Sequence, residues 1–343
     1  MRAVYADKPY SIQLRDIPLP EIGEDEVLIK LSYAGICGSD LHAYRGRHAF
    51  RRPPVMLGHE MSGRIAKLGG AVSGLSLGQP VAVMPQINCG VCPDCVNGRA
   101  HLCEHRIMPS TPGWRGLGTF ADYFAAPASV ICPLGELPLD LGALSEPMAV
   151  ATHLMSRIPR GHNEDLVIIG AGTIGLLLLI IAPSYGFRNI LVTDIADENL
   201  SLAGKLGAAA GVNAAREDAV ARVKEHFGPR GCGTVIVAAG GPDIMAQAME
   251  MTKPGGTVMF VAMITEESSF VTYPIVFKEL NILGSFNYTM EDFESAVAFL
   301  KSHGDSIRRI ITHTMSADEA AGAFRLLDER KEFAVKILLS FDK

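Results

Sequence analysis

The sequence predicts an α/β protein of two domains, one rich in β-strands and one built on a doubly wound parallel sheet. Three observations predict this class. The chain has 343 residues, which is enough for two hydrophobic cores. Residues 1 to about 135 hold short strand-like runs broken by Gly and Pro, whereas strands and helices alternate from about Glu164 onward. From about Tyr288 the pattern becomes helical and ends in the strand-like run 334–341.

Each element is predicted from its own local pattern. The first strand-like runs are short, rich in Val, Ile and Leu, and bounded by Gly or Pro: 27–36, 63–70 and 79–85. Buried parallel strands are predicted for the apolar runs 166–169, 189–195, 234–241 and 255–263. Helices are predicted for the segments 173–182, 198–208, 244–253, 290–302 and 316–329. The final strand lacks a partner in the parallel sheet, so we expect it to return to the first domain. The expected domains are therefore 1–150 plus 288–343, and 151–287.

Four cysteines fall within fifteen consecutive positions, at spacings of three, three and eight: Cys89, Cys92, Cys95 and Cys103. A Zn²⁺ ion prefers four thiolates in a closed tetrahedron, and short loops let the chain wrap one ion. Because such a site leaves no position open for a substrate, we expect a structural zinc knuckle. The alternatives are a disulfide pair or scattered buried cysteines.

A glycine-rich motif, GAGTIG, follows an apolar strand and opens a predicted helix. Its first glycine permits a tight turn, its second lets the backbone approach a pyrophosphate, and its third lets helix and strand pack closely. Phosphates would then bind the free N–H groups at the helix N-terminus. The residues expected at the cofactor are Gly170, Gly172, Thr173, Ile174 and Gly175. The alternative is a glycine-rich turn that binds nothing.

An acidic residue, Asp194, ends the next strand, nineteen positions after Gly175. A carboxylate there can accept from both ribose hydroxyls and would repel a 2′-phosphate, so the motif predicts NAD rather than NADP. Pro183 interrupts the helix that the motif opens and should end or kink it early.

Three further segments carry polar residues inside apolar surroundings: GICGSDLH (35–42), LGHE (57–60) and LSEP (144–147). Cys37, His59 and Glu146 offer one sulfur, one nitrogen and one oxygen, and three protein ligands leave a fourth position for water or substrate. Spacing alone does not join these distant segments. Taken singly, the three residues are equally well explained as a buried cysteine, a core histidine and a helix-capping glutamate.

Together, these motifs make the chain resemble the zinc-dependent medium-chain dehydrogenases, in the branch of polyol (sorbitol) and threonine dehydrogenases. GICGSDLH resembles the first catalytic-zinc segment of that family, GHE the second, the four cysteines its structural zinc site, and GAGTIG with Asp194 its NAD site. The resemblance covers nearly the whole chain. It implies a GroES-like, β-rich catalytic domain with an inserted Rossmann domain, two zinc ions per chain and NAD.

The resemblance also implies roles for individual residues. Cys37, His59 and Glu146 would hold a catalytic zinc, with Glu146 where ethanol dehydrogenases carry a Cys. Glu60 resembles a neighbouring carboxylate that approaches the metal when water exchanges. Ser39 would accept the proton of the substrate hydroxyl, and His42 would pass it to solvent by way of the ribose hydroxyls. A surface histidine is the alternative for His42.

The alcohol itself is less well defined by the sequence. Thr111, Trp114 and Phe286 are the candidate pocket residues. Several arginines stand between or after the ligand motifs and would favour a carboxylate or phosphate on the substrate if they point inward: Arg45, Arg47, Arg51, Arg52 and Arg115. A solvated charged face is the alternative. Asn287 stands where sorbitol dehydrogenases usually carry Arg, which weakens that specific assignment.

Composition limits the remaining classes. The net charge of −6 argues against non-specific nucleic-acid binding. The longest apolar run, Ile174–Ala182, is far shorter than the ~20 residues of a bilayer span. Reduced thiols on zinc fit a cytoplasmic protein. We therefore expect an enzyme of small-molecule alcohols such as polyols or sugar acids, with neither nucleic-acid nor membrane partners, assembled as a homodimer or homotetramer through 282–286. The alternative is a zinc-holding, nucleotide-binding relative with a regulatory role and no turnover.

Overall fold

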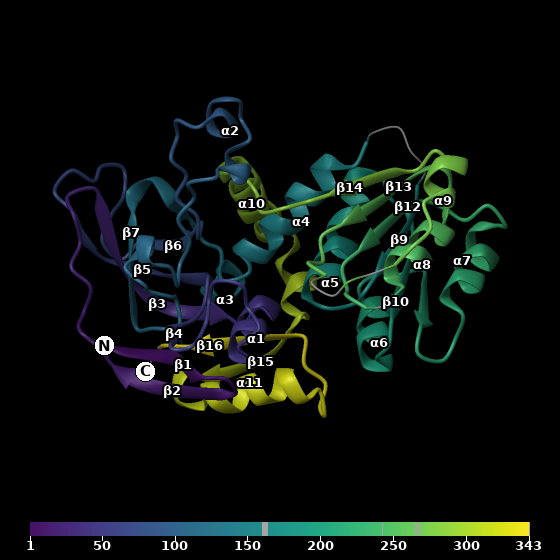
Figure 1. Ribbon diagram of the computed structural model, residues 1–343. Helices are drawn as coiled ribbons and strands as arrows, with labels where there is room; N and C mark the ends of the chain where they lie inside the picture. Colours follow the sequence, from purple (N-terminus) through teal and green to yellow (C-terminus); the bar gives the residue numbers. More distant parts are fainter. Residues whose placement is uncertain (160–163, 242, 265–266, 268, 343) are drawn as a thin grey trace. The chain divides into compact units, whose positions relative to one another are not determined.

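The computed structural model describes residues 1–159, 164–241, 243–264, 267 and 269–342 (Figure 1). The chain divides into two compact units, Met1–Ala149 with Tyr288–Lys343, and Val150–Asn287. The expected domain boundaries include residues that the structure does not describe: Lys343 in the first domain and 160–163, 242, 265–266 and 268 in the second. Helix α4 (Ser145–Arg157) runs from the first unit into the second.

The first unit contains two sheets among its described residues. The smaller has the order β2-β1-β4, formed by Ser11–Asp16, Arg2–Lys8 and Val55–Met56. The larger has the order β15-β16-β3-β5-β6-β8, with β7 also paired to β3. Its strands are β3 (Glu26–Gly35), β5 (Glu60–Leu68), β6 (Pro80–Val83), β7 (Tyr123–Pro127), β8 (Ile131–Pro133), β15 (Ile311–Ser316) and β16 (Lys336–Ser340). Pairing of β16 with β3 confirms that the last strand returns to the first part of the chain.

The first unit also contains helices. They are α1 (Gly38–Tyr44), α2 (Pro93–Val96), α3 (Leu139–Gly142), α10 (Met290–Arg308) and α11 (Ala320–Glu329). Of these, α1, α3 and α11 pack against its strands. One hydrophobic core joins α1, α11, β1 and β16, and its buried members include Leu41, Tyr44, Phe324 and Ile337. Figure 1 shows α1 and α11 beside β15 and β16. Because Leu41 and Tyr44 are packed in this core, helix α1 has a fixed position on the sheet.

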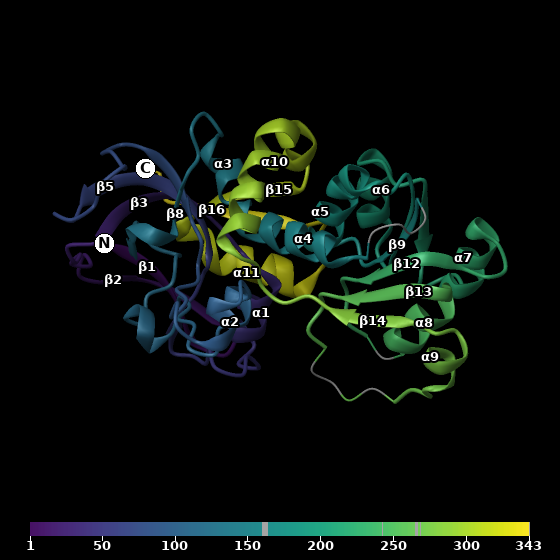
Figure 2. The same cartoon turned by 90° about the horizontal axis from the view of Figure 1, so that it is seen from above.

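The second unit is built on a parallel sheet, ordered β11-β10-β9-β12-β13-β14 among the described residues. Its strands are β9 (Asp165–Ile169), β10 (Asn189–Asp194), β11 (Ala210–Asn213), β12 (Cys232–Val237), β13 (Thr252–Phe260) and β14 (Asn281–Gly284). Its helices are α5 (Thr173–Ile181), α6 (Asp197–Lys205), α7 (Ala219–Phe227), α8 (Ile244–Met251) and α9 (Tyr273–Phe277). Figure 2 shows α5 and α6 on one face of this sheet and α8 on the other. The reversal of strand order between β9 and β12 is typical of doubly wound nucleotide-binding folds.

Pro183 ends the first helix of this unit, as expected. Helix α5 stops at Ile181, and Ala182–Tyr185 continues as a 3₁₀ turn that ends at the left-handed Gly186. The prolyl ring removes the N–H that the next helical turn would need. In the part of the chain that the structure describes, no helix has the length and apolar character needed to cross a bilayer.

Candidate active site and metal centres

The four clustered cysteines meet in one loop that carries α2. Their sulfur atoms lie within 4.8 Å of one another, and all four thiols are free. Sγ of Cys89 lies 3.5 Å from Sγ of Cys103 and 3.9 Å from Sγ of Cys95. Zn–S bonds of about 2.3 Å give a tetrahedron with edges of about 3.8 Å, so the spacing fits a closed zinc site. Left-handed glycines at positions 90 and 98 make the two turns that bring the sulfurs together.

The electrostatics of this loop also fit a cation. Backbone N–H groups of Val91 and Cys92 lower the pKa of Cys89 to about 6. Desolvation and the neighbouring Cys92 raise the pKa of Cys95 to about 12. Thiols this close cannot all ionise against one another, and a bound divalent cation removes that repulsion. The cysteines therefore fit a structural zinc.

A second cluster joins α1, β5 and the loop before it. Ligand atoms of Cys37, His59 and Glu60 lie within 4.8 Å of one another. Cys37 precedes the first turn of α1, and its N–H donates to the Asp40 carboxylate at 3.1 Å, which fixes the start of that helix. His59 is 6% exposed and Glu60 1%. Sulfur, nitrogen and oxygen donors gathered in one buried place are typical of a catalytic zinc site.

Asp40 determines how His59 is oriented. Its Oδ1 lies 3.4 Å from Nδ1 of His59 and 3.3 Å from Nη1 of Arg51. A histidine that donates Nδ1–H to a carboxylate leaves the Nε2 lone pair for a metal. Burial would raise the pKa of Asp40, but His59 and Arg51 lower it to about 2. Burial would likewise lower the pKa of His59, but Asp40 and Cys37 raise it well above its usual value.

Glu60 is held by a lysine from the other end of the chain. Nζ of Lys336 donates to Oε2 and Oε1 of Glu60 at 2.7 and 2.8 Å, and to the carbonyl of Ile36 at 3.0 Å. Burial would lower the pKa of Lys336, but the Glu60 carboxylate raises it. Gly35 makes room for this carboxylate, since a Cβ there would lie 1.9 Å from Oε2 of Glu60.

Glu146, the expected third ligand, is not in the close set with Cys37 and His59, whereas Glu60 is. Oε1 of Glu146 accepts the hydroxyl of Tyr288 at 2.8 Å. Burial raises the pKa of the Glu146 carboxyl, and the charge of Glu60 adds to the rise. The structure thus gathers two carboxylates at this site, with Glu60 nearer to the sulfur and the imidazole.

The two residues expected to handle the proton lie on α1. Ser39 is half-buried, and its Oγ accepts from Nη2 of Arg51 at 3.0 Å. His42 is exposed on the outer face of the helix, because Leu41, Ala43 and Tyr44 bury the opposite face.

The glycine motif lies between β9 and α5 in the second unit. Gly170 has φ of 102°, and a Cβ there would lie 2.7 Å from the Ala239 side chain. A Cβ on Gly175 would lie 1.8 Å from the carbonyl oxygen of Gly170, so only glycine lets helix and strand approach this closely. Gly172, the N-cap of α5, has nothing within 4 Å of its Cβ position. Thr173 and Ile174 open the helix and are half-buried.

Asp194 stands at the carboxyl end of β10 and holds the motif. Its Oδ2 accepts the N–H of Ala171 at 2.7 Å, and its Oδ1 accepts the N–H of Ala196 at 2.9 Å. Open space at Gly172 together with a carboxylate at the next strand end fits the pyrophosphate and ribose of a dinucleotide.

Comparisons with known proteins agree with this arrangement. The model of the alcohol dehydrogenase GroES-like domain matches residues 23–136, and that of the zinc-binding dehydrogenases matches residues 173–302. A probable D-xylulose reductase A from Aspergillus clavatus is 34% identical over 92% of this chain and 90% of its own. The chain is a zinc-dependent medium-chain dehydrogenase. It belongs to the polyol and threonine dehydrogenase branch and is an oxidoreductase that acts on hydroxyl groups.

Two further relatives support this membership. An L-threonine 3-dehydrogenase from Xanthomonas campestris pv. campestris is 33% identical over 96% of both chains. The structure of an alcohol dehydrogenase from E. coli CFT073, solved as a complex with NADH, has a TM-score of 0.90 and 27% identity over 99% of both chains. The fold class is therefore confirmed, as a GroES-like domain with a Rossmann-type domain. A non-catalytic role is not favoured, because the named relatives are enzymes.

The candidate substrate residues of this dehydrogenase lie in different surroundings. Trp114 is buried, 4% exposed, and its indole N–H donates to the carbonyl of Ala125 at 3.0 Å while its ring packs on Phe124. This places Trp114 in the core of the first unit. Thr111 is half-buried and donates to the carbonyl of Met108. Phe286 follows β14 in the second unit and is 38% exposed.

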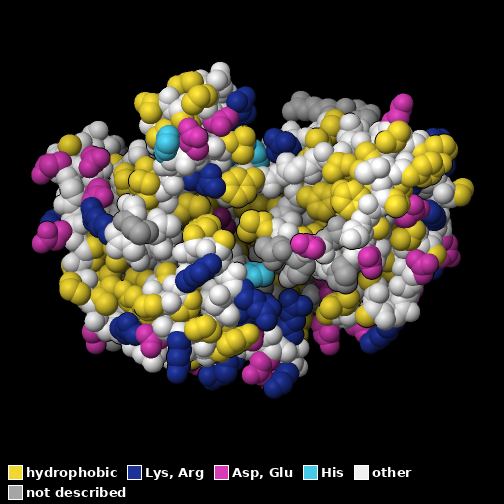
Figure 3. All heavy atoms as spheres, viewed as in Figure 1, with side chains coloured by type: hydrophobic (Ala, Val, Ile, Leu, Met, Phe, Trp, Pro, Cys, Tyr) yellow, Lys and Arg dark blue, Asp and Glu magenta, His cyan; other side chains and the backbone are white. Residues whose placement is uncertain are grey.

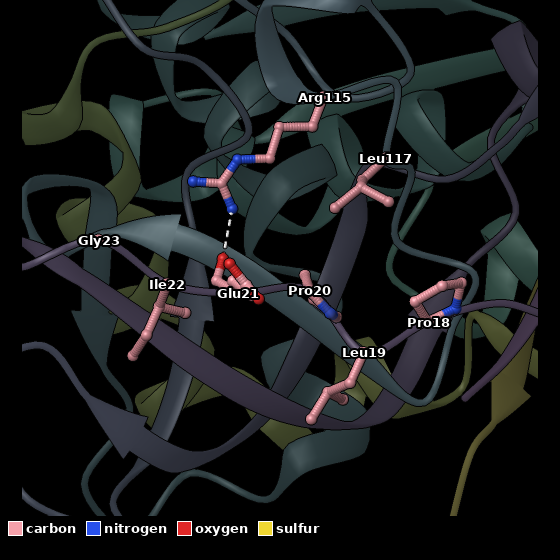
Figure 4. Close-up of a pocket in the computed structure, with 8 residues that line it drawn as sticks. All are labelled: Pro18, Leu19, Pro20, Glu21, Ile22, Gly23, Arg115 and Leu117. Atoms are coloured by element: carbon pink, nitrogen blue, oxygen red, sulfur yellow. Dashed lines mark hydrogen bonds between the residues drawn. The ribbon is translucent and has the colours of Figure 1, made fainter.

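A separate hollow of about 550 Å³ lies in the first unit, lined by Pro18, Leu19, Pro20, Glu21, Ile22, Gly23, Arg115 and Leu117 (Figure 4). It contains none of the metal or proton-handling residues. Figure 4 shows Arg115 reaching toward Glu21, and its guanidinium donates to that residue's carbonyl at 2.7 Å. It also pairs with Glu26 at 2.6 Å. Arg115 therefore joins two loops of the dehydrogenase rather than facing a substrate.

Sequence reasoning missed several residues that this dehydrogenase gathers at its site: Asp40, His48, Tyr288 and Lys336. Two of them carried a signal. Asp40 stands three residues after Cys37, the spacing of a capping carboxylate. Lys336 is the single charge in a strand of Ile and Leu, and a buried lysine requires a partner. Tyr288 carried no comparable signal.

Proposed function

We propose that this protein is an NAD- and zinc-dependent dehydrogenase that oxidises a secondary alcohol of a polyol, a sugar acid or a related hydroxy compound. The observation that carries the proposal is the gathering of Cys37, His59 and Glu60 donor atoms within 4.8 Å in a chain of this family. A structural zinc site has four protein ligands, whereas three protein ligands leave one position open for water or substrate.

Each residue has a chemical role in the proposal. Zinc held by Cys37, His59 and a carboxylate supplies a Lewis acid that lowers the pKa of the substrate hydroxyl, and NAD accepts the hydride. Oγ of Ser39 would accept the hydroxyl proton and release its own, which the ribose hydroxyls of NAD would carry to His42. His42, exposed on α1, would then pass a proton to solvent. Asp40 holds Nδ1 of His59, so that Nε2 is available to the metal. The charge of Lys336 balances the charge of the buried Glu60 carboxylate.

The third ligand is decided by a matched pair of variants. Glu60→Gln removes the carboxylate nearest the sulfur and imidazole, so we expect zinc to fall from two ions to one per chain by elemental analysis. Glu146→Gln should keep both ions bound, because its carboxylate accepts from Tyr288. The opposite result, with zinc lost only from Glu146→Gln, would return the ligand role to Glu146.

The proposed cofactor is NAD rather than NADP. Asp194 ends β10 next to the glycine motif, where its negative charge would repel a 2′-phosphate. Asp194→Ala should weaken NAD binding and reduce the preference for NAD over NADP. Titration of both nucleotides into wild type and variant measures this change.

A substrate panel tests the function as a whole. Neutral polyols, aldonates and polyol phosphates are incubated with zinc-loaded protein and NAD, and NADH absorbance is followed. We expect at least one class to reduce NAD. If none does while two zinc ions and NAD remain bound, the regulatory, non-catalytic alternative replaces this proposal.

We further propose a cytoplasmic homodimer or homotetramer without nucleic-acid or membrane partners. Free thiols in a cluster that fits zinc suit a reducing compartment, and the net charge of −6 disfavours contact with phosphate backbones. Among the described residues, β14 pairs with β13 on one side and with no strand on the other, so we propose this open edge as the contact with a second copy.

A further inference from the structure

Arg51 is a buried cation beside the proposed proton acceptor. It lies in the loop between α1 and β4 and is 6% exposed. Its guanidinium reaches Oδ1 of Asp40 at 3.3 Å, Oγ of Ser39 at 3.0 Å and Nε2 of His48 at 3.2 Å. Because Arg51 is buried, its charge is not part of a solvated surface, and its position next to Ser39 suggests a role at the site.

The two edges of this guanidinium have different partners. Nη1 lies 3.3 Å from Oδ1 of Asp40, which supplies the counter-charge, and 3.2 Å from Nδ1 of His59. The opposite edge, formed by Nε and Nη2, faces Ser39 and His48 and meets no carboxylate among the described residues. That edge is the one with which arginine binds a carboxylate or phosphate through two parallel hydrogen bonds.

His48 cannot satisfy the donors that surround it. Its Nδ1 lies 3.1 Å from the backbone N–H of Arg51, and its Nε2 lies 3.2–3.3 Å from the guanidinium N–H groups of the same residue. A neutral imidazole carries a proton on one of its two nitrogens. The protonated nitrogen, whichever it is, therefore points its N–H at another N–H group, either that of the backbone or that of the guanidinium. An anionic oxygen that took the place of Nε2 of His48 at this edge would accept from Nε and Nη2 of Arg51, and the displaced ring could donate to the same anion.

The other arginines of this region are already engaged or face solvent. Arg45 pairs with Asp328 at 2.5 Å, and Arg115 pairs with Glu26. Arg47 and Arg52 are exposed. Arg51 is thus the buried member of the group, and the one that touches Ser39.

We propose that the Nε–Nη2 edge of Arg51, together with His48, binds an oxyanion of the substrate next to the hydroxyl that is oxidised. The substrate would then be a hydroxy acid or a phosphorylated polyol rather than a neutral polyol. This inference rests on the proposed function, since it takes Ser39 as the acceptor of the reacting proton. A carboxylate and a phosphate share the required chemistry, and the experiment separates them.

The test uses three six-carbon compounds that differ in charge: D-glucitol, D-gluconate and D-glucitol 6-phosphate. Each is titrated by calorimetry into zinc-loaded protein without NAD, and each is assayed with NAD for kcat/KM. The variants are Arg51→Gln, which removes the charge, and Arg51→Lys, which keeps the charge but not the fork. Arg52→Gln, the exposed neighbour, is the matched control, and thermal unfolding checks that each variant is folded.

Wild type and Arg52→Gln should bind one anionic compound more tightly than D-glucitol. Both Arg51 variants should lose roughly 10- to 100-fold of that affinity, as expected for a hydrogen-bonded charge pair. The ratio of kcat/KM for the anionic compound to that for D-glucitol should fall by a similar factor. If Arg51→Gln does not fold, the Arg51→Lys result decides, because Lys preserves the charge opposite Asp40.

Equal binding of all three compounds by wild type, or unchanged anion affinity in Arg51→Lys, would overturn the inference. Which of the two anions binds distinguishes a hydroxy acid from a polyol phosphate. Anion binding lost in the Arg51 variants without NAD reduction by any compound would leave this subsite standing and refute the proposed function. NAD reduction with no preference for an anion would refute this subsite and leave the proposed function standing.

Discussion

At the scale of single residues, two almost fully buried carboxylates organise the catalytic cluster. Asp40 is 0% and Glu60 1% exposed. Each has a cationic partner within 3.3 Å, Arg51 for the first and Lys336 for the second. A buried charge without a partner costs several kcal/mol, so both partners are necessary to keep the carboxylates ionised where a metal would need them.

Gly35 offers a direct test of this packing. A Cβ at Gly35 would lie 1.9 Å from Oε2 of Glu60 and must displace it from Lys336. We expect Gly35→Ala to lower the free energy of unfolding by about 1–3 kcal/mol, in the range of overpacked cores, and to reduce zinc content. Denaturant unfolding and elemental analysis measure the two effects.

Gly38→Ala is the matched control for stability, since nothing lies within 4 Å of its Cβ position. It stands in the first turn of α1, where alanine is at least as favourable as glycine. Equal stability of the two variants would show that Glu60 is not fixed as described.

At the scale of single elements, the cysteine loop and the glycine turn could be predicted from sequence because their chemistry is local. Cys89 to Cys103 and Gly170 to Gly175 each lie within a few turns of chain, so spacing alone reports their geometry. The pairing of Glu60 with Lys336 spans 276 positions, and nothing in either local pattern selects the other residue. Arg51 looked like one charge among several, and only the folded loop shows that it is buried.

Trp114 shows where a local pattern is ambiguous. A lone tryptophan after a metal loop suggested a pocket residue, and in the structure its ring is buried against Phe124 and its N–H donates to the carbonyl of Ala125. The sequence pattern of an aromatic residue in a polar loop does not tell whether its ring contacts a ligand or packs in the core.

Thiol labelling tests the cysteine loop as an element. Burial raises the pKa of Cys132 to about 11 and that of Cys232 to about 12, so both remain protonated and unreactive at pH 8. Zinc should protect the four clustered thiols as well. We expect a strong chelator to expose Cys89, whose pKa is lowered to about 6, to alkylation in the folded protein, while Cys132 and Cys232 stay unlabelled, as counted by mass spectrometry.

Cys95→Ser should release the structural zinc and lower the midpoint of thermal unfolding, because the remaining three sulfurs no longer close the tetrahedron. It should leave NAD affinity unchanged, since the glycine motif lies in the second unit. Retention of both zinc ions with unaltered thermal stability would refute the assignment of this loop.

At the scale of the whole molecule, the proposed assembly depends on one edge of the parallel sheet. Strand β14 is the last in the sheet order, and α9, which precedes it, exposes Tyr273, Val276 and Phe277 at 66–74%. Figure 3 shows hydrophobic side chains gathered on the unit that carries this helix. An open strand edge beside exposed aromatic rings is a surface that soluble proteins usually cover.

Light scattering on a sizing column should therefore give a mass that is a multiple of the 36.7 kDa chain. Val276→Asp with Phe277→Asp places two charges on this surface and should shift the mass toward the single chain. Leu77→Asp, an equally exposed apolar site in the first unit, should leave the assembly intact. A wild-type protein that stays a single chain at micromolar concentration, or a double variant that assembles as wild type does, would exclude this edge as the contact.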